Sequence, residues 1–141
     1  MSFVVDASVA AKWLVREADS DKAEALLIQW KQGDFDLLAP EIVLAEIGSM
    51  IWKKSLRGLM PPDAALEVYE KFMRVSLPLA PIHDLAGPAL KLALQYRHSV
   101  YDGLYVALAQ MTGWRLITAD EKLYNMLASG FPQVCLLRQW T

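Results

Sequence analysis

The sequence predicts an α/β fold of three layers, in which helices cover both faces of a central, mainly parallel sheet of four to five short strands. Short apolar runs rich in β-branched residues alternate with stretches of helical length along the whole chain. The first run, Phe3-Val4-Val5, lacks the polar alternation of a half-exposed strand. Such a run is typical of a parallel strand that is buried on both faces.

In the first part of the chain we expect strands at 3–5 and 35–39, and helices over 9–16, from about 20 to Gly33, and 40–57. Ser8 is placed to cap the first helix, and Ser20 or Asp21 the second. Pro40 suits the first turn of the third helix, because its missing N–H has no partner there anyway. Gly58 supplies the stop.

In the second part we expect helices over 62–75, from 84–88 to 96–98, 101–111 and 121–128, with strands at 77–80, 115–118 and 134–137. The stretch from Tyr101 to Met111 is apolar on nearly every side, and Asp102 is its only charge. A helix of this composition is buried. It should therefore lie directly against the sheet.

Length and composition set limits on the class of protein. A chain of 141 residues predicts a single domain over 1–141. No apolar run is long enough to span a bilayer, and no signal-peptide pattern is present, so we expect a cytoplasmic protein without a membrane partner. The single cysteine, Cys135, excludes an internal disulfide and fits a reducing compartment. A net charge of −2 argues against nucleic-acid binding driven by a large positive field.

Acidic residues follow or begin several of the predicted elements at one edge of the sheet. Asp6 and Asp120 come directly after two strands, and the carboxyl ends of parallel strands border the ligand crevice. Glu46 and Asp102 are charges among apolar neighbours on helices that start at that edge. Alone, Asp6 or Asp120 could be a helix cap and Asp102 a first-turn acid, but Glu46 has no such local explanation.

A divalent cation would relieve the repulsion between these carboxylates, since Lys12 is the only basic residue expected near Asp6. Oxygen ligands favour Mg²⁺ or Mn²⁺, and His83 and His98 lack the spacing for zinc. Ser8 and Thr118 each stand two residues from an acid and are expected to support the site. Such a site suits phosphoryl transfer, in which the cation lowers the pKa of a water and neutralises charge on the phosphate.

Four motifs together resemble the PIN-domain family, and most closely the VapC-type toxins of toxin–antitoxin pairs. They are Val5-Asp6-Ala7-Ser8, Glu46, Tyr101-Asp102 with Ala107-Leu108-Ala109, and Thr118-Ala119-Asp120. The resemblance spans essentially the whole chain, with Gly103 as a departure where alanine is common.

The resemblance implies a Mg²⁺-dependent ribonuclease whose metal-binding and catalytic acids are Asp6, Glu46, Asp102 and Asp120, with Ser8 and Thr118 supporting them. It also implies a homodimer, an RNA substrate, and inhibition by a cognate antitoxin whose C-terminal segment reaches the acidic pocket. The surface that binds RNA has no motif of its own. Lys12, Lys53, Lys54 and Arg57 are the candidates for it.

Three other functions share parts of this sequence pattern. A phosphoacceptor receiver has adjacent acids after its first strand, where this chain has only Asp6, and a haloacid-type phosphatase needs an Asp where Ser8 stands. The third is a binding module that is held by its antitoxin and has latent or no nuclease activity. Its basis is an apolar surface expected around Trp30, Ile51 and Trp52, which could accept an amphipathic partner helix.

Overall fold

A five-stranded parallel sheet in the order β3-β2-β1-β4-β5 forms the centre of the computed structural model, which describes residues 1–141. The strands are β1 (Phe3–Val5), β2 (Leu37–Pro40), β3 (Leu79–Ala80), β4 (Arg115–Thr118) and β5 (Val134–Leu136). Their bounds differ from the predicted ones by no more than two residues. The order is not the 2-1-3-4-5 of receiver domains, so the topology that a receiver would share is absent.

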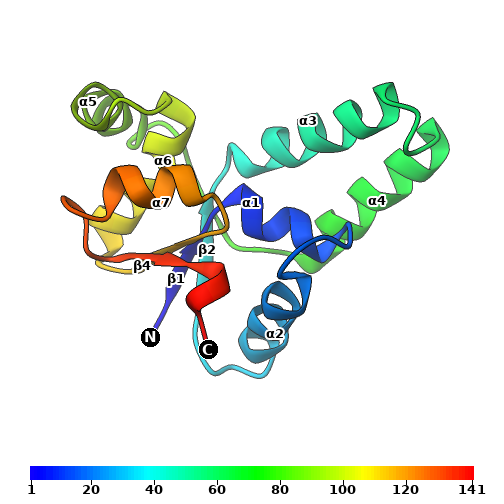
Figure 1. Ribbon diagram of the computed structural model, residues 1–141, viewed down its shortest axis with the longest axis horizontal. Coiled ribbons are helices and arrows are strands. Elements are labelled where there is room, and N and C mark those ends of the chain that lie inside the picture. Colours follow the sequence, from blue (N-terminus) through cyan, green and yellow to red (C-terminus); the bar gives the residue numbers. More distant parts are fainter.

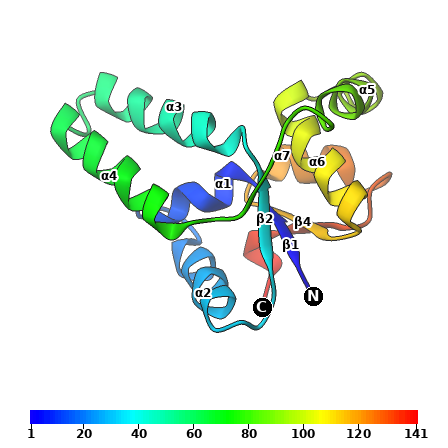
Figure 2. The ribbon, with the colours of Figure 1, turned by 180° about the vertical axis from the view of Figure 1, so that it is seen from behind.

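Helices cover both faces of this sheet, which confirms the three-layer prediction. They are α1 (Ala7–Ala10), α2 (Ser20–Lys31), α3 (Val43–Leu56), α4 (Pro62–Val75), α5 (Ala86–Tyr96), α6 (Val100–Thr112) and α7 (Glu121–Leu127). Figure 1 and Figure 2 show α1 to α4 on one side of the strands and α5 to α7 on the other, with α3 and α4 forming a hairpin that projects from the body. None of the helices combines the length and hydropathy needed to cross a lipid bilayer.

The hydrophobic core is built around β1 and α6. All three residues of β1 are fully buried, as its uniformly apolar sequence predicts. Residues 103–109 of α6 are buried as well, and this helix packs against β1, β2 and β4. The most apolar helix and the most apolar strand therefore lie against each other beneath the sheet edge where the acids gather.

The first helix differs from its prediction at both ends. It begins at Ala7 and continues only as a 3₁₀ turn to Trp13, instead of running from Val9 to Arg16. Asp6 occupies the N-cap position that was expected for Ser8. The backbone carbonyl of Asp6 already accepts hydrogen bonds from the helix, and the Ser8 hydroxyl points to other partners, so Ser8 lies inside the first turn.

The predicted caps of α2 are also wrong. Asp19 holds the N-cap position in a left-handed conformation (φ 64°), and Ser20 is the first helical residue. The Ser20 hydroxyl accepts a hydrogen bond from the Glu17 N–H at 2.9 Å, so it closes the preceding turn. Asp21 forms an ion pair with Arg16 on the surface.

Pro40 ends β2 and does not begin α3. It is buried and stands in register with Ala80 of β3, and the Glu41 N–H continues the ladder to the Ala80 carbonyl at 2.9 Å. A proline at the end of a strand removes little from the ladder. Because α3 starts at Val43 and not at Pro40, Glu46 lies in its first turn, near the sheet edge.

The apolar surface predicted around Trp30 is only partly present. Ile51 is buried in the core and Trp30 is half-buried against it, which leaves Trp52 as the exposed member of the three. The sequence spacing of these residues does not determine which of them face the core and which face solvent. Only the packing of α3 and α2 against the core decides which side chains remain outside.

Candidate active site

Asp6 and Asp120 follow the carboxyl ends of β1, the central strand of the sheet, and of its neighbour β4. β1 and β4 are hydrogen-bonded neighbours, with Val5 in register with Ile117. The chain leaves β1 towards one face and β4 towards the other, which makes this point the topological switch of the sheet. Ligand sites of open α/β sheets lie in the crevice at such a point.

The Asp6 carboxylate is held by two hydroxyl groups on one of its oxygens. Ser8 Oγ donates to Asp6 Oδ2 at 2.6 Å, and Thr118 Oγ1 donates to the same atom at 2.7 Å. Asp6 is only 6% exposed, and no protein group donates a hydrogen bond to its Oδ1. The two hydroxyls thus fix the orientation of the carboxylate and leave its second oxygen free for a ligand.

Those hydroxyls also tie the loop after β4 to α1. The Ala119 N–H donates to Ser8 Oγ at 3.0 Å, and the Asp120 N–H donates to Thr118 Oγ1 at 3.1 Å. Asp120 Oδ1 in turn accepts from the Leu123 N–H at 3.2 Å, so Asp120 caps α7 as its position suggested. One oxygen of Asp120 therefore serves the helix, and the residue remains exposed.

Glu46 reaches the same region from α3 and receives a hydrogen bond that the sequence did not reveal. The hydroxyl of Tyr105, on α6, donates to Glu46 Oε1 at 2.6 Å. Tyr105 is fully buried, and its neighbourhood of apolar residues gave it the signature of a core aromatic. An apolar sequence pattern identifies a tyrosine as a core residue but does not show the partner of its hydroxyl. A buried tyrosine hydroxyl needs a hydrogen-bond partner.

Asp102 lies in the first turn of α6, behind the N-cap residue Ser99. The Ser99 hydroxyl accepts a hydrogen bond from the Asp102 backbone N–H at 3.0 Å. This leaves Asp102 half-buried at the start of the helix, on the edge of a cavity of about 330 Å³ that Asp120 also lines.

Burial and mutual repulsion raise the pKa values of three of the acids. Desolvation is the main cause for Asp6, Glu46 and Asp102, and it exceeds the opposing effect of their hydrogen bonds. The charges of Asp102 and Asp120 further raise the pKa of Asp6, and those of Asp6 and Asp102 raise the pKa of Glu46. The acids are therefore close enough to interact electrostatically across the site.

None of the four acids forms an ion pair, and the only basic side chain that acts on one of them is His98, whose charge opposes the rise in the pKa of Asp102. Lys12, the expected exception, forms its ion pair with Glu17 at 3.3 Å and not with Asp6. The remaining ion pairs of the chain involve none of the four acids. Carboxylates that have no ion-pair partner fit a hard divalent cation, so the donor chemistry agrees with Mg²⁺ or Mn²⁺.

The geometry also limits how a cation could be held. No group of three or more acidic, histidine or cysteine side chains is arranged to hold one ion directly. Mg²⁺ commonly binds through one or two carboxylates and keeps several waters in its shell. Asp6, with its free oxygen, is the residue best placed to be such a direct ligand.

We expect Tyr105→Phe to lower stability in a pH-dependent way, because the lost hydrogen bond ends on a group that titrates. At neutral pH the loss should be about 2 kcal/mol, as for bonds to charged groups. It should shrink as Glu46 becomes protonated in acid. Tyr69→Phe is the matched control, since Tyr69 donates to the uncharged Leu44 carbonyl at 2.9 Å and its loss should not vary with pH. Urea unfolding at several pH values measures the stability loss of both variants. If the two losses depend on pH in the same way, the hydrogen bond assigned between Tyr105 and Glu46 is contradicted.

Comparison with known proteins supports the same family. The PIN domain family model matches residues 3–127. Ribonuclease VapC3 from Pyrobaculum aerophilum is 33% identical over 125 residues, which cover 87% of this chain and 92% of that protein.

Two solved structures share the fold at low sequence identity. Mycobacterium tuberculosis VapC20, described as a sarcin-ricin loop cleaving toxin, has a TM-score of 0.66 and 17% identity, and the match covers 92% of this chain and 95% of that one. A toxin–antitoxin complex from Klebsiella pneumoniae has a TM-score of 0.61 and 16% identity, with 95% and 96% covered. These two structures show the shared fold. The family model and the relative that is 33% identical confirm the resemblance found in the sequence: the chain belongs to the PIN-domain family.

Proposed function

We propose that the protein is a divalent-metal-dependent endoribonuclease and the toxin of a toxin–antitoxin pair. The observation that supports this best is Asp6, a buried carboxylate with one oxygen fixed by Ser8 and Thr118 and the other free. The relative that is 33% identical is a ribonuclease by name, and one structural neighbour cleaves the sarcin-ricin loop. The substrate proposed for this chain is therefore RNA.

The roles of the residues follow from their surroundings. In this proposal Asp6, Glu46, Asp102 and Asp120 hold Mg²⁺, directly or through water, and Ser8 and Thr118 keep Asp6 oriented. When bound, the cation would supply an activated water and neutralise charge on the scissile phosphate. Tyr105 holds the Glu46 carboxylate in position from the core side.

Cleavage within a chain, and not at its end, suits the surroundings of the acids. A cavity of about 620 Å³ opens beside Glu46, and the separate cavity of about 330 Å³ opens beside Asp102 and Asp120. An RNA strand that crosses the acids can thus continue on both sides. An exonuclease site would instead close around a strand end.

Cleavage of total cellular RNA by the purified protein, followed by mapping of new 5′ ends, tests this function. We expect discrete new ends with Mg²⁺ and none with a chelator. Restoring Mg²⁺ after chelation should restore the same ends. If folded, partner-free protein produces no ends in any condition, the nuclease proposal fails and the alternative of an antitoxin-bound binding module gains support.

We further propose that an antitoxin and a second copy of the chain are its protein partners. The α3–α4 hairpin exposes large apolar side chains, among them Trp52 (57%), Leu56 (67%) and Leu66 (67%). Exposed apolar patches of this kind mark interaction sites. A structural neighbour is a toxin–antitoxin complex, which makes a small antitoxin the natural candidate. Light scattering of the chain alone and after co-expression with its genomic neighbour would show whether it is monomer, homodimer or complex.

A further inference from the structure

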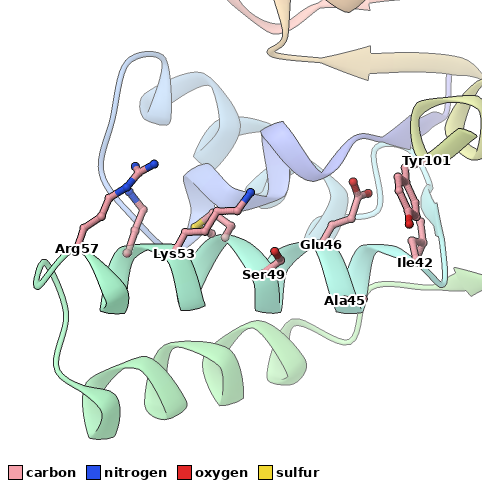
Figure 3. A pocket seen from close by; sticks show the side chains of 9 residues that line it. Ile42, Ala45, Glu46, Ser49, Lys53, Arg57 and Tyr101 are labelled. Carbon is pink, nitrogen blue, oxygen red and sulfur yellow. The ribbon is translucent and has the colours of Figure 1, made fainter. Parts of the chain in front are cut away.

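The cavity beside Glu46 is a groove that runs along α3. It is lined on α3 by Glu46, Ser49 and three cations near the end of the helix, Lys53, Lys54 and Arg57. Figure 3 shows Glu46, Ser49, Lys53 and Arg57 in one row on the same side of α3, with Tyr101 next to Glu46 at the other end. The groove thus joins an acid of the candidate active site to a basic surface.

The sequence spacing explains this row. Glu46, Ser49 and Lys53 are three and four residues apart, and Arg57 follows four residues later. Residues at such intervals share one face of a helix. At 1.5 Å per residue the row spans about 16 Å from the acid to the last cation. A ligand lying in the groove would therefore be elongated.

The three cations are not committed to other groups of the protein. None of them forms an ion pair, whereas Lys12, Arg16 and Arg138 each pair with an acid. Cations near a helix C-terminus also complement its dipole, which accounts for their place on α3. It does not account for a cavity that connects them to Glu46. Because the net charge is −2, any attraction for a polyanion must come from such a local cluster.

We propose that this α3 groove holds the RNA backbone on one side of the cleavage position, with Lys53 and Arg57 contacting phosphates and Tyr101 stacking on a base beside Glu46. Tyr101 is 58% exposed and lines the groove at its Glu46 end, where its ring can meet an unpaired base. The inference rests on the proposed function in that the ligand is RNA. It adds the path that the strand follows across the molecule.

Binding can be measured apart from catalysis by working in an Asp6→Asn background. The probe is a fluorescein-labelled single-stranded RNA of random sequence, titrated at several salt concentrations. Each phosphate contact to a single strand contributes about 0.7 to the slope of log K against log salt. For Lys53→Ala/Arg57→Ala we expect the slope to fall by about 1.4 and the affinity at about 0.1 M salt to drop roughly 25-fold.

Arg74→Ala/Lys91→Ala is the matched control, because it removes the same charge from exposed positions on α4 and α5 that do not line the groove. We expect its affinity to change less than about twofold. A second variant, Tyr101→Leu, separates stacking from charge. It should weaken binding by about tenfold or more at an unchanged salt slope, because stacking releases no counterions.

Groove variants that bind RNA as tightly as the control would overturn the proposal, as would equal losses in both double variants. Loss of antitoxin binding with RNA affinity intact would also overturn it and assign the groove to a protein. The proposed nuclease is judged separately, by whether the chain with Asp6 intact cleaves RNA in Mg²⁺. If the groove binds RNA but the protein does not cleave it, the nuclease proposal has failed. If the protein cleaves RNA but the groove variants bind it as tightly as the control, the groove proposal has failed.

Discussion

Asp6→Asn is expected to abolish RNA cleavage while the protein stays folded. The asparagine oxygen can still accept the hydrogen bonds of Ser8 and Thr118, so the local structure should persist. The amide has no negative charge with which to attract a divalent cation. A loss of several kcal/mol of charge stabilisation lowers the rate roughly a thousand-fold. Asp34→Asn is the matched control, because Asp34 is exposed and distant from the site in the loop before β2, and it should cleave like wild type.

The same substitution should raise stability in the absence of metal. Burial raises the pKa of Asp6 above its ordinary value of 3.8, so folding disfavours its charged form. A carboxyl group whose pKa is raised on folding stabilises the protein at pH values below its pKa in the unfolded state. This stabilisation is lost as the pH rises through its pKa in the folded state. With chelator at pH 7, Asp6→Asn should therefore melt above wild type, and the gain should vanish below about pH 4.

Thermal melts with and without Mg²⁺ complete the test. The cation should raise the melting temperature of the wild type through binding to the folded state, and should leave that of Asp6→Asn nearly unchanged. A variant that cleaves at the wild-type rate would exclude Asp6 from the chemistry. A metal-free variant less stable than wild type would show instead that the carboxylate has a structural role.

The positions of Asp6 and Asp120 could be predicted because topology alone decides them. A residue that directly follows a parallel strand must stand at the carboxyl edge of the sheet, whatever the side chains do. The predicted helix over 40–57 places Glu46 well inside it, whereas α3 begins at Val43 and Glu46 lies in its first turn. The prediction that Glu46 lies at the carboxyl edge of the sheet is nevertheless right, because α3 starts at that edge.

Features that depend on contacts between side chains could not be predicted from the sequence. Tyr105 looks like any aromatic of a buried helix until its hydroxyl is seen next to Glu46. Lys12 seemed near Asp6 along the chain, but the early end of α1 turns it towards Glu17. Lys53 and Arg57 were candidates for RNA contact without a reason to prefer them. Only the groove along α3 connects them to the acids.

For Gly103→Ala, helix propensity and the packing seen in the structure predict changes in stability of opposite sign. Helix propensity marks a glycine inside α6 as a weakness, and its replacement by alanine as a gain of about 1 kcal/mol. In the structure a Cβ at this position would lie 2.5 Å from the backbone oxygen of Ala89 on α5. The neighbour is backbone, so the helices would have to separate. We expect a net loss of about 1–3 kcal/mol in the free energy of unfolding.

Gly48→Ala provides the control within another helix, α3. There the added Cβ would meet only the Tyr69 ring, at an ordinary 3.5 Å, and the propensity gain should be expressed. Urea unfolding of both variants should thus give changes of opposite sign. Gly103 is the first buried residue of α6 and directly follows Asp102, so separating α5 from α6 should also displace that acid and reduce cleavage. A Gly103→Ala protein as stable and active as wild type would mean that this close approach does not fix the position of Asp102.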